Sequence, residues 1–491
     1  MPYKHGTYGE ITASKVRNAV SAETVAVYVG TAPVNLIRGY ATAGVINKPI
    51  RVSNFGEAQR KLGYAADWDA FTLCEAFSEH FDNPVGNIGP IFVINVLDPS
   101  THKKSTQTTT ATVFTAGRGE ITSDKIILDT IEIADNTEGT DYSVRYDFNT
   151  GKCIIEALPG KTLSGSINVT YYEVDSTAVT ASSIIGEITA AGVYTGLQAI
   201  NLIYGEYHAI PNLLAAPGWS HTPAIYNALL TAAEKINGHW DAFVLADIPL
   251  VDNNSAVDTI AKAKAWKTTN GYNGERSKVC WPQVKGANGK IYHLSTICAA
   301  TMMRADAEHD GIPYESPSNK LIDAVAQYFG ASATNQGYDQ IAANELNESG
   351  ITTAAYWGGR WVLWGPHTAA YSSAGVEDAR AMFDTAVRML LHITNGFQER
   401  HAGKIDQPMD LNLRESIINE EQQILDSYAG RGALLGTPTI EFVESENDAG
   451  DIANGDFVWH LNVTPTVPFK SGTARVTYTD EGFSAYFGGE S

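Results

Sequence analysis

The sequence predicts a multidomain protein of mixed α+β and α/β class, with a mixed sheet, an inserted all-β sandwich and an extended arm at each end. At 491 residues the chain is too long for one ordinary core, so two or three domains are expected. Apolar runs of strand length alternate with amphipathic helical segments on both sides of a Thr- and Ser-rich stretch. Residues 1–20 are short of large apolar groups, and after Pro468 the chain has little left with which to pack, so both ends are interpreted as extended arms. The predicted division is an arm at 1–20, an α/β domain at 21–100 plus 186–350, a β-sandwich at 101–185, a C-terminal domain at 351–469 and a second arm at 470–491.

The first part of the α/β domain is predicted from two apolar runs and two helical segments. Residues 23–30 and 91–97 have the length and apolar content of buried strands. A helix is expected after Ser53, ending near Gly63, and another at 69–81. Strands that alternate with helices predict an α/β arrangement.

The stretch from 101 to 185 loses helical periodicity and alternates polar with apolar residues. Tyr142, Val144 and Tyr146 lie at every second position and are followed by an Asn-Thr-Gly turn at 149–151. Ile167, Val169 and Tyr171 alternate in the same way. The pattern predicts a small β-sandwich inserted into the α/β domain.

The α/β pattern resumes near residue 197 and continues into the C-terminal domain. Pro223 marks the first turn of a helix, and Ser255 with Asp258 is interpreted as the start of a helix through Trp266. The other predicted helices are 297–309, 319–329, 376–394 and 413–428. The other predicted strands are 241–246, 279–281, 290–294, 360–364, 456–463 and 473–479.

Charge and hydropathy exclude several classes of function. The net charge of −21, with scattered Lys and Arg, argues against a sequence-independent grip on nucleic acid. The longest apolar runs, such as 91–97, are far shorter than a membrane span, and no secretion signal opens the chain, so a cytoplasmic product is expected. Four scattered cysteines without C-x-x-C spacing predict reduced, buried thiols, and a bridge between Cys280 and Cys298 or between subunits is the alternative.

No pattern of catalytic or metal-binding residues is found. The chain has no H-E-x-x-H, no P-loop, no G-x-S-x-G and no metal-spaced Cys/His cluster. The glycine-rich run 430–436 follows a predicted helix rather than a strand, which indicates a helix terminator and a turn. Trp357, Trp361 and Trp364 surround one predicted strand, and a packing cluster is favoured over a ligand cage. We therefore predict no catalytic residue, no cofactor and no metal.

Short segments along most of the chain, apart from the 101–185 insertion, occur in an order that resembles the contractile tail sheath family of phages. The most specific is Arg304-Ala305-Asp306 followed by the Gly311–Asn319 segment, in which Tyr314 stands where Trp is common. The other matching segments are His5–Glu10, Val25–Pro33, Asn47–Val52, Asn212–Gly218, Leu245–Pro249, Asn344–Ile351, Arg360–Gly365 and Gly432–Gly436.

The resemblance implies a structural subunit and not an enzyme. Such a subunit polymerises helically around the tail tube and contracts to drive the tube through the host envelope. In this family, N- and C-terminal strands leave their own subunit and complete a sheet on neighbours. The implied inter-subunit residues are Tyr3, His5, Thr7, Tyr8, Glu10 and Ile11 in the N-terminal arm and Thr473, Ala474, Arg475, Val476, Thr477 and Tyr478 in the C-terminal arm.

The α/β domain at 21–100 plus 186–350 is then expected to be the outer one, with the inserted sandwich projecting outward from it, and the domain at 351–469 is expected to lie innermost. We expect the helix 413–428 to touch the tail tube through exposed positions, with Arg414, Glu415, Glu420 and Glu421 as candidates. The expected partners are further copies of the chain and the tail tube, baseplate and tail terminator proteins, with no nucleic acid and no membrane contact by the subunit itself. The expected location is the virion tail, after assembly in the cytoplasm of the host bacterium.

Two alternatives remain open at this point. One, in the same class, is the sheath of a phage-derived bacteriocin or injection machine. The other, from a different class, is a cytosolic α/β enzyme with a β accessory module.

Overall fold

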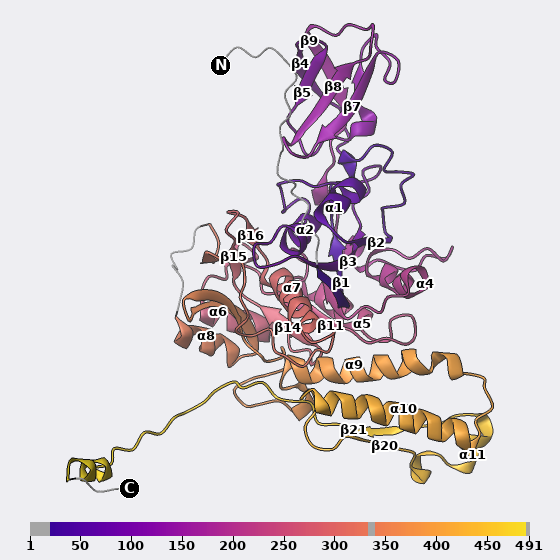
Figure 1. The fold of residues 1–491 in the computed structure, drawn as a ribbon. Helices are drawn as coiled ribbons and strands as arrows, with labels where there is room; N and C mark the ends of the chain where they lie inside the picture. The colour runs from indigo at the N-terminus through magenta and orange to yellow at the C-terminus, as the bar shows by residue number, and fades with distance from the viewer. Residues whose placement is uncertain (1–19, 332–338, 488–491) are drawn as a thin grey trace, which may run out of the picture.

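The computed structural model describes residues 20–331 and 339–487 of the chain. Figure 1 shows three parts in a stack: a β-sandwich at the top, an α/β body in the middle and a layer of two long helices below it. A long C-terminal segment leaves from beneath the body. The mixed architecture confirms the predicted fold class.

The body is built on a mixed sheet of eight strands in the order β19-β18-β14-β11-β10-β1-β3-β2. The six inner strands run parallel, and the edge strands β19 and β2 pair antiparallel to their neighbours. Parallel strands covered on both faces need continuous apolar runs, which these segments provide. The bounds are β1 Val20–Gly30, β2 Pro49–Val52, β3 Ile88–Asn95, β10 Leu213–Ala215, β11 Phe243–Asp247, β14 Ser277–Cys280, β18 Ile351–Trp357 and β19 Arg360–Trp364.

Helices surround this sheet on both sides. One of them, α7 (Leu294–Ala307), is buried along most of its length and packs against β1 and β11. The others are α1 Phe55–Leu62, α2 Leu73–Phe81, α3 Ala181–Ile185, α4 Ile203–Tyr207, α5 Pro223–Ala232, α6 Ile260–Thr269 and α8 Gln340–Asn347. Short strands form two further small sheets: β12 Val251–Asp252 with β13 Ser255–Ala256, and β15 Gln283–Lys285 with β16 Ile291–Tyr292 and β17 Ala326–Tyr328.

The inserted sandwich consists of two three-stranded sheets, β4-β9-β6 and β5-β8-β7, with a core of its own. That core includes Phe114, Tyr142, Ile155 and Val169, so the residues that alternate in the sequence do point inward. The strands are β4 Thr108–Phe114, β5 Arg118–Ile121, β6 Glu132–Ile133, β7 Tyr142–Asp147, β8 Lys152–Ala157 and β9 Gly165–Tyr171.

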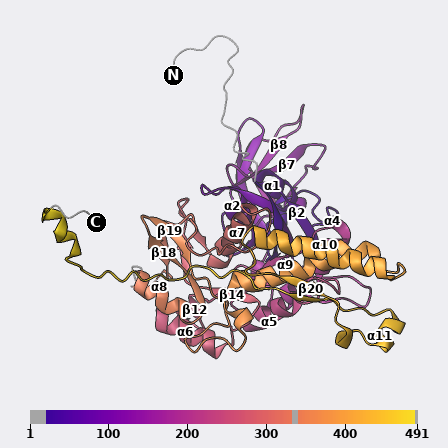
Figure 2. The ribbon, with the colours of Figure 1, turned by 60° about the horizontal axis from the view of Figure 1, so that its bottom comes forward.

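The lower layer is a helical hairpin with a small sheet beneath it. Its elements are α9 Asp384–His401, α10 Leu411–Gly430, β20 Thr439–Glu441, α11 Ala449–Asn454 and β21 His460–Asn462. Figure 2 shows the two long helices side by side across the body and the C-terminal segment departing on the side of α8 and β18.

Several predicted elements are wrong or shifted. The helix expected at 319–329 does not form, because its backbone pairs with neighbouring strands: Ile322 N–H donates to Trp361 O and Val325 N–H to Lys285 O. The helix expected from Ser255 starts at Ile260 with Thr259 as its N-cap, since Ser255 lies in β13. The helix expected from 376 starts at Asp384. The strand expected at 473–479 is not paired within the described chain.

Candidate assembly site

The small sheet of the lower layer has only two strands, β20 and β21, in the described part of the chain. They pair antiparallel, with Ile440 opposite Leu461. A two-stranded sheet leaves one row of backbone donors and acceptors on each outer edge. This sheet can therefore accept a further strand.

The two edges of this sheet are not equivalent. On the β20 edge the side chain of Gln422 from α10 accepts from Ile440 N–H at 3.2 Å and donates to Pro438 O at 2.9 Å. Among the described residues, no side chain hydrogen-bonds the backbone of 460–462 in the same way. The β21 edge is therefore the open one.

One face of the sheet is apolar and lies on the helical hairpin. Ile440 belongs to the same core cluster as Met389 and Leu425 of the two helices, and Leu461 packs against that cluster. An aromatic cluster continues this layer beside the sheet; its members are Phe397, Phe442, Phe457 and Trp459. A strand added at β21 would extend the layer if its own apolar side chains alternate.

The C-terminal arm, here residues 469–487, has that alternation and is unused by its own subunit. Val476 and Tyr478 are 92% and 78% exposed, and with Ala474 they occupy alternate positions, whereas Thr473, Arg475 and Thr477 fall on the opposite face of an extended chain. Residues 471–478 make no hydrogen bond with the rest of the described chain. Figure 1 shows the segment projecting away from the body and ending in a short 3₁₀ helix.

The predicted N-terminal contacts Tyr3, His5, Thr7, Tyr8, Glu10 and Ile11 lie outside the described residues. The chain is described from Val20, where it enters β1, an interior strand of the large sheet.

Of the candidate tube-facing residues on α10, Glu415 and Glu420 are exposed and Arg414 is half-buried. The prediction that Glu421 is exposed is wrong, since its side chain is 0% exposed. Arg400 of α9 donates to both carboxylate oxygens of Glu421, each at 2.7 Å, and the His401 Nε2 lies 2.8 Å from Oε1. Burial lowers the pKa of His401 although this carboxylate is adjacent. Glu421 thus joins the two helices.

The periodicity of α10 could have placed Glu421 correctly. Ile417, Leu425 and Tyr428 are buried, and they lie four residues before, four after and seven after it. Positions at this spacing share one helix face. Glu420 is one residue away, so it turns about 100° around the helix and reaches solvent, where it pairs with Lys404 at 2.6 Å.

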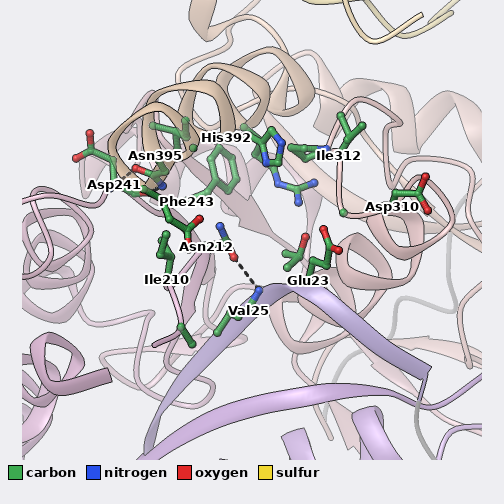
Figure 3. A pocket seen from close by; sticks show the side chains of 18 of the residues that line it. Glu23, Val25, Ile210, Asn212, Asp241, Phe243, Asp310, Ile312, His392 and Asn395 are labelled. Atoms are coloured by element: carbon green, nitrogen blue, oxygen red, sulfur yellow. Dashed lines mark hydrogen bonds between the residues drawn. The ribbon is translucent and has the colours of Figure 1, made fainter. Parts of the chain in front are cut away.

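A cleft of about 900 Å³ lies between the body and the helical hairpin, lined by residues of β1, β11 and α9 (Figure 3). Beside it, polar contacts fix α9 to the body. The buried Lys278 ammonium lies 2.6 Å from the Asp384 carboxylate. Asn395 donates to Asp241 O at 2.8 Å and accepts from Asp241 N–H at 3.1 Å.

A second buried ion pair extends this joint to β1. Arg388 of α9 pairs with Asp306 of α7, and Thr24 of β1 donates to the same carboxylate at 2.6 Å. Burial raises the pKa of Asp306, although Arg388 partly offsets this. Strand β1, the first in the described chain, is thereby connected to the helical layer.

No group of His, Cys, Asp or Glu side chains suited to a metal ion occurs in residues 20–331 and 339–487. Within those ranges no helix is both long and apolar enough to cross a membrane. The four cysteines are free and buried, as predicted. Burial and the neighbouring Cys298 thiol raise the pKa of Cys280.

Sequence comparison finds similar proteins along nearly the whole chain, although no family model matches it. The tail sheath protein of Burkholderia phage BcepMu is 26% identical over 494 residues, covering 94% of this chain and 96% of the relative. The tail sheath protein of Escherichia phage P2 is 24% identical over 309 residues, covering 62% of this chain and 72% of the relative.

Solved structures share the fold at low sequence identity. A chain of the anti-feeding prophage baseplate matches with a TM-score of 0.57 and 14% identity, covering 98% of this chain and all of the other. A chain of the PVC sheath complex of an extracellular contractile injection system, in its contracted state, matches with a TM-score of 0.56 and 12% identity, covering 98% of this chain and 99% of the other. The resemblance predicted from the sequence is confirmed, and the chain is a homologue of the contractile tail sheath proteins.

Proposed function

We propose that this protein is the structural subunit of a contractile tail sheath, which polymerises helically around a tail tube and contracts to drive the tube through the host envelope. The observation that carries the proposal is that one molecule has both a strand without a partner and an open edge that can accept a strand. The subunit presents an unpaired, alternating arm and also an open strand edge at β21. The role is structural and non-enzymatic, as the sheath homologues suggest.

The arm of one copy adds to β21 of the next in this proposal. Each backbone hydrogen bond contributes about 0.5–1.5 kcal/mol net, so an added strand of about five residues contributes several kcal/mol per junction. The apolar side chains of Ala474, Val476 and Tyr478 extend the layer formed by Ile440 and Leu461. Because donor and acceptor surfaces differ, the contact is heterologous and generates a helix of copies.

Such a junction also suits contraction. The segment 471–478 has no hydrogen bond to its own body, so the body can rotate about it while the strand stays paired. The surfaces of the bodies then repack between an extended and a shortened tube. Since the net charge of −21 makes the copies repel, backbone pairing and shape supply the attraction.

The remaining partners follow from this role. We propose that the helical layer faces the tail tube through α10, with Arg414, Glu415 and Glu420 as contacts, and that the sheath meets baseplate and tail terminator proteins at its ends. The exposed charge on α10 is mostly acidic, so a basic tube surface is expected. The proposed location is the virion tail, with assembly in the host cytoplasm.

A second candidate is the sheath of an injection machine without a genome. It is favoured by the structural likeness to chains of the anti-feeding prophage and PVC assemblies. Particles purified from the producing bacterium distinguish the two: a phage carries a capsid with DNA, and an injection machine carries neither.

Arm truncation tests the proposal. Chains lacking residues 1–19 or 471–491 are expected to fold as monomers and to form no tubes, because the strands that link the copies are gone. Negative-stain microscopy and sedimentation compare them with the full chain at equal concentration. Tubes of normal length from both truncated chains would contradict the proposal, and circular dichroism controls for folding.

A further inference from the structure

The tip of the β18–β19 hairpin carries large aromatic side chains that its own subunit leaves exposed. Tyr356 is 59% and Trp357 44% exposed, and Arg360 follows across the Gly358-Gly359 turn. Tyr, Trp and Arg are the residues that most often dominate the energy of protein interfaces. We call these three residues the aromatic prong.

The prong is held in a defined shape by the strands behind it. Tyr356 pairs with Trp361 across the hairpin, with ring centroids 5.7 Å apart. On the other face Trp357 lies 5.9 Å from Trp364, whose indole N–H donates to Asn344 of α8 at 2.9 Å. A preorganised aromatic surface loses little conformational entropy on binding.

Further apolar side chains are exposed on the elements that neighbour the hairpin. Ile341 of α8 is 78% exposed, and Leu321 and Val325 lie in the segment that borders β19 and β15. The backbone of Ala354 in β18 accepts from Gln327, which keeps that segment against the hairpin. Contiguous exposed apolar groups of this kind mark interaction sites.

The prong adjoins the root of the C-terminal arm. Trp364 and Asn344 line a groove of about 770 Å³ that is also lined by Pro468 and by Phe469, Lys470 and Ser471, the first residues of the arm. Lys470 lies above the Tyr371 ring in the same groove, 5.8 Å from its centroid. Figures 1 and 2 both show the arm leaving on the side of α8.

The reach of the arm limits which molecule can face the prong. From Phe469 to Asp480 the arm spans at most about 40 Å when fully extended. A compact body of about 470 residues has a radius of gyration of about 23 Å, so the arm cannot pass over one copy to reach another. The copy that takes the arm must therefore lie within about 40 Å of the arm's root, close to Trp364, which is in ring contact with Trp357 of the prong.

We infer that the aromatic prong is a body-to-body contact with a second copy of this chain, the same copy that receives the C-terminal arm. The inference rests on the proposed function. The arm tethers the neighbour, and the prong fixes the orientation in which that neighbour packs. Without the prong, copies stay linked through their arms but do not reach the regular geometry of a tube.

Surface variants of the full chain test this contact. One variant carries Tyr356→Ser and Trp357→Ser, and a second carries Ile341→Lys at the edge of the same surface. A matched control carries Val113→Ser and Ile188→Ser, which removes exposed apolar groups from other faces. Melting temperatures of the monomers, which we expect to be unchanged, show that each variant folds.

The readout is the protein concentration at which tubes appear by negative-stain microscopy. We expect the Tyr356/Trp357 variant and the Ile341 variant each to raise this concentration more than about tenfold, as loss of an interface hot spot does, and to give short flexible chains below it. The control should assemble like the native chain. Prong variants that form tubes at the native concentration would overturn the inference.

A chain ending at Lys470 separates this result from the proposed function. If that chain fails to associate while the prong variants form normal tubes, the prong inference is wrong and the arm mechanism stands. If the chain ending at Lys470 forms normal tubes, the arm mechanism itself is wrong. Prong variants that assemble normally alone and fail only around purified tail tube would assign the prong to the tube, which also overturns the inference.

Discussion

Loss of the Glu421 carboxylate should lower the stability of the helical layer, because this group pairs with Arg400 and His401. Replacement by Gln leaves the buried His401 side chain, and the Arg400 side chain, which is 29% exposed, without an anionic partner. Breaking a partly buried charge network by removing one member costs about 3 kcal/mol. We expect Glu421→Gln to lower the free energy of unfolding of the monomer by that order, measured by urea denaturation of a chain that lacks residues 471–491.

The neighbouring Glu420 provides a control for that change. Its side chain is 50% exposed, and that of its partner Lys404 is 21% exposed, so water reaches this ion pair. Exposed ion pairs contribute little, so Glu420→Gln should change the free energy of unfolding by less than about 0.5 kcal/mol. Equal effects of the two substitutions would contradict the assignment of Glu421 as a link between the helices.

For single residues, the sequence predicted burial correctly where a regular alternation was present, and less well elsewhere. The alternating residues of the sandwich, such as Tyr142 and Val144, are buried as expected. Glu421 was misplaced because its charge was weighed above its spacing from Ile417 and Leu425. The exposure of Tyr356 and Trp357 could not be predicted, since an aromatic run in a strand normally marks a core and only tertiary packing decides which members are covered.

At the scale of single elements, the two faces of the C-terminal arm are expected to tolerate substitution differently. An added strand turns Ala474, Val476 and Tyr478 toward one face and Thr473, Arg475 and Thr477 toward the other. We expect Val476→Asp to prevent tube formation, because it places a charge in the apolar layer, whereas Thr477→Asp should permit it. Sedimentation of assembled material measures both. Equal loss in the two variants would indicate that the arm does not pair with a fixed face.

Strands and helices with strong local signals were predicted well, and those set by tertiary contacts were not. The helix after Ser53 forms at Phe55–Leu62, with Asn54 capping it and Gly63 ending it. The segment 319–329 has helix-compatible residues, yet the N–H groups of Ile322 and Val325 donate to the backbone of neighbouring strands. The strand predicted at 473–479 has the right pattern and no partner strand in one subunit, which is what a strand reserved for another copy would show.

At the scale of the whole molecule, we expect that the sandwich can be deleted without loss of assembly. Its two connections are adjacent, since Lys104 N–H donates to Glu173 O and Asp175 N–H donates to His102 O, both at 2.9 Å. We expect a chain in which residues 104–173 are replaced by Gly-Ser to assemble into tubes of normal length. This chain also carries Leu36→Ser, because Leu36 packs in the core of the sandwich and its apolar side chain would otherwise be exposed. Microscopy of the tubes would show them thinner. Failure to assemble in a folded variant would mean that the sandwich lies between copies.

The position of the sandwich could be predicted from the sequence because the composition changes where the sandwich begins. The Thr- and Ser-rich texture begins near residue 101, and the sandwich strands run from Thr108 to Tyr171. The contacts that hold the parts together were not readable. The Lys278–Asp384 and Arg388–Asp306 pairs join residues about a hundred positions apart, and no local pattern announces such a partner.

The described chain begins in β1, a strand bonded to β3 on one side and β10 on the other. A pull along β1 from Val20 therefore loads many hydrogen bonds in shear at once, whereas a pull across the strand would break them one after another. Mechanical load that enters a subunit here spreads into the stiffest layer of the molecule. A tube built of such subunits can shorten abruptly without tearing its own units open.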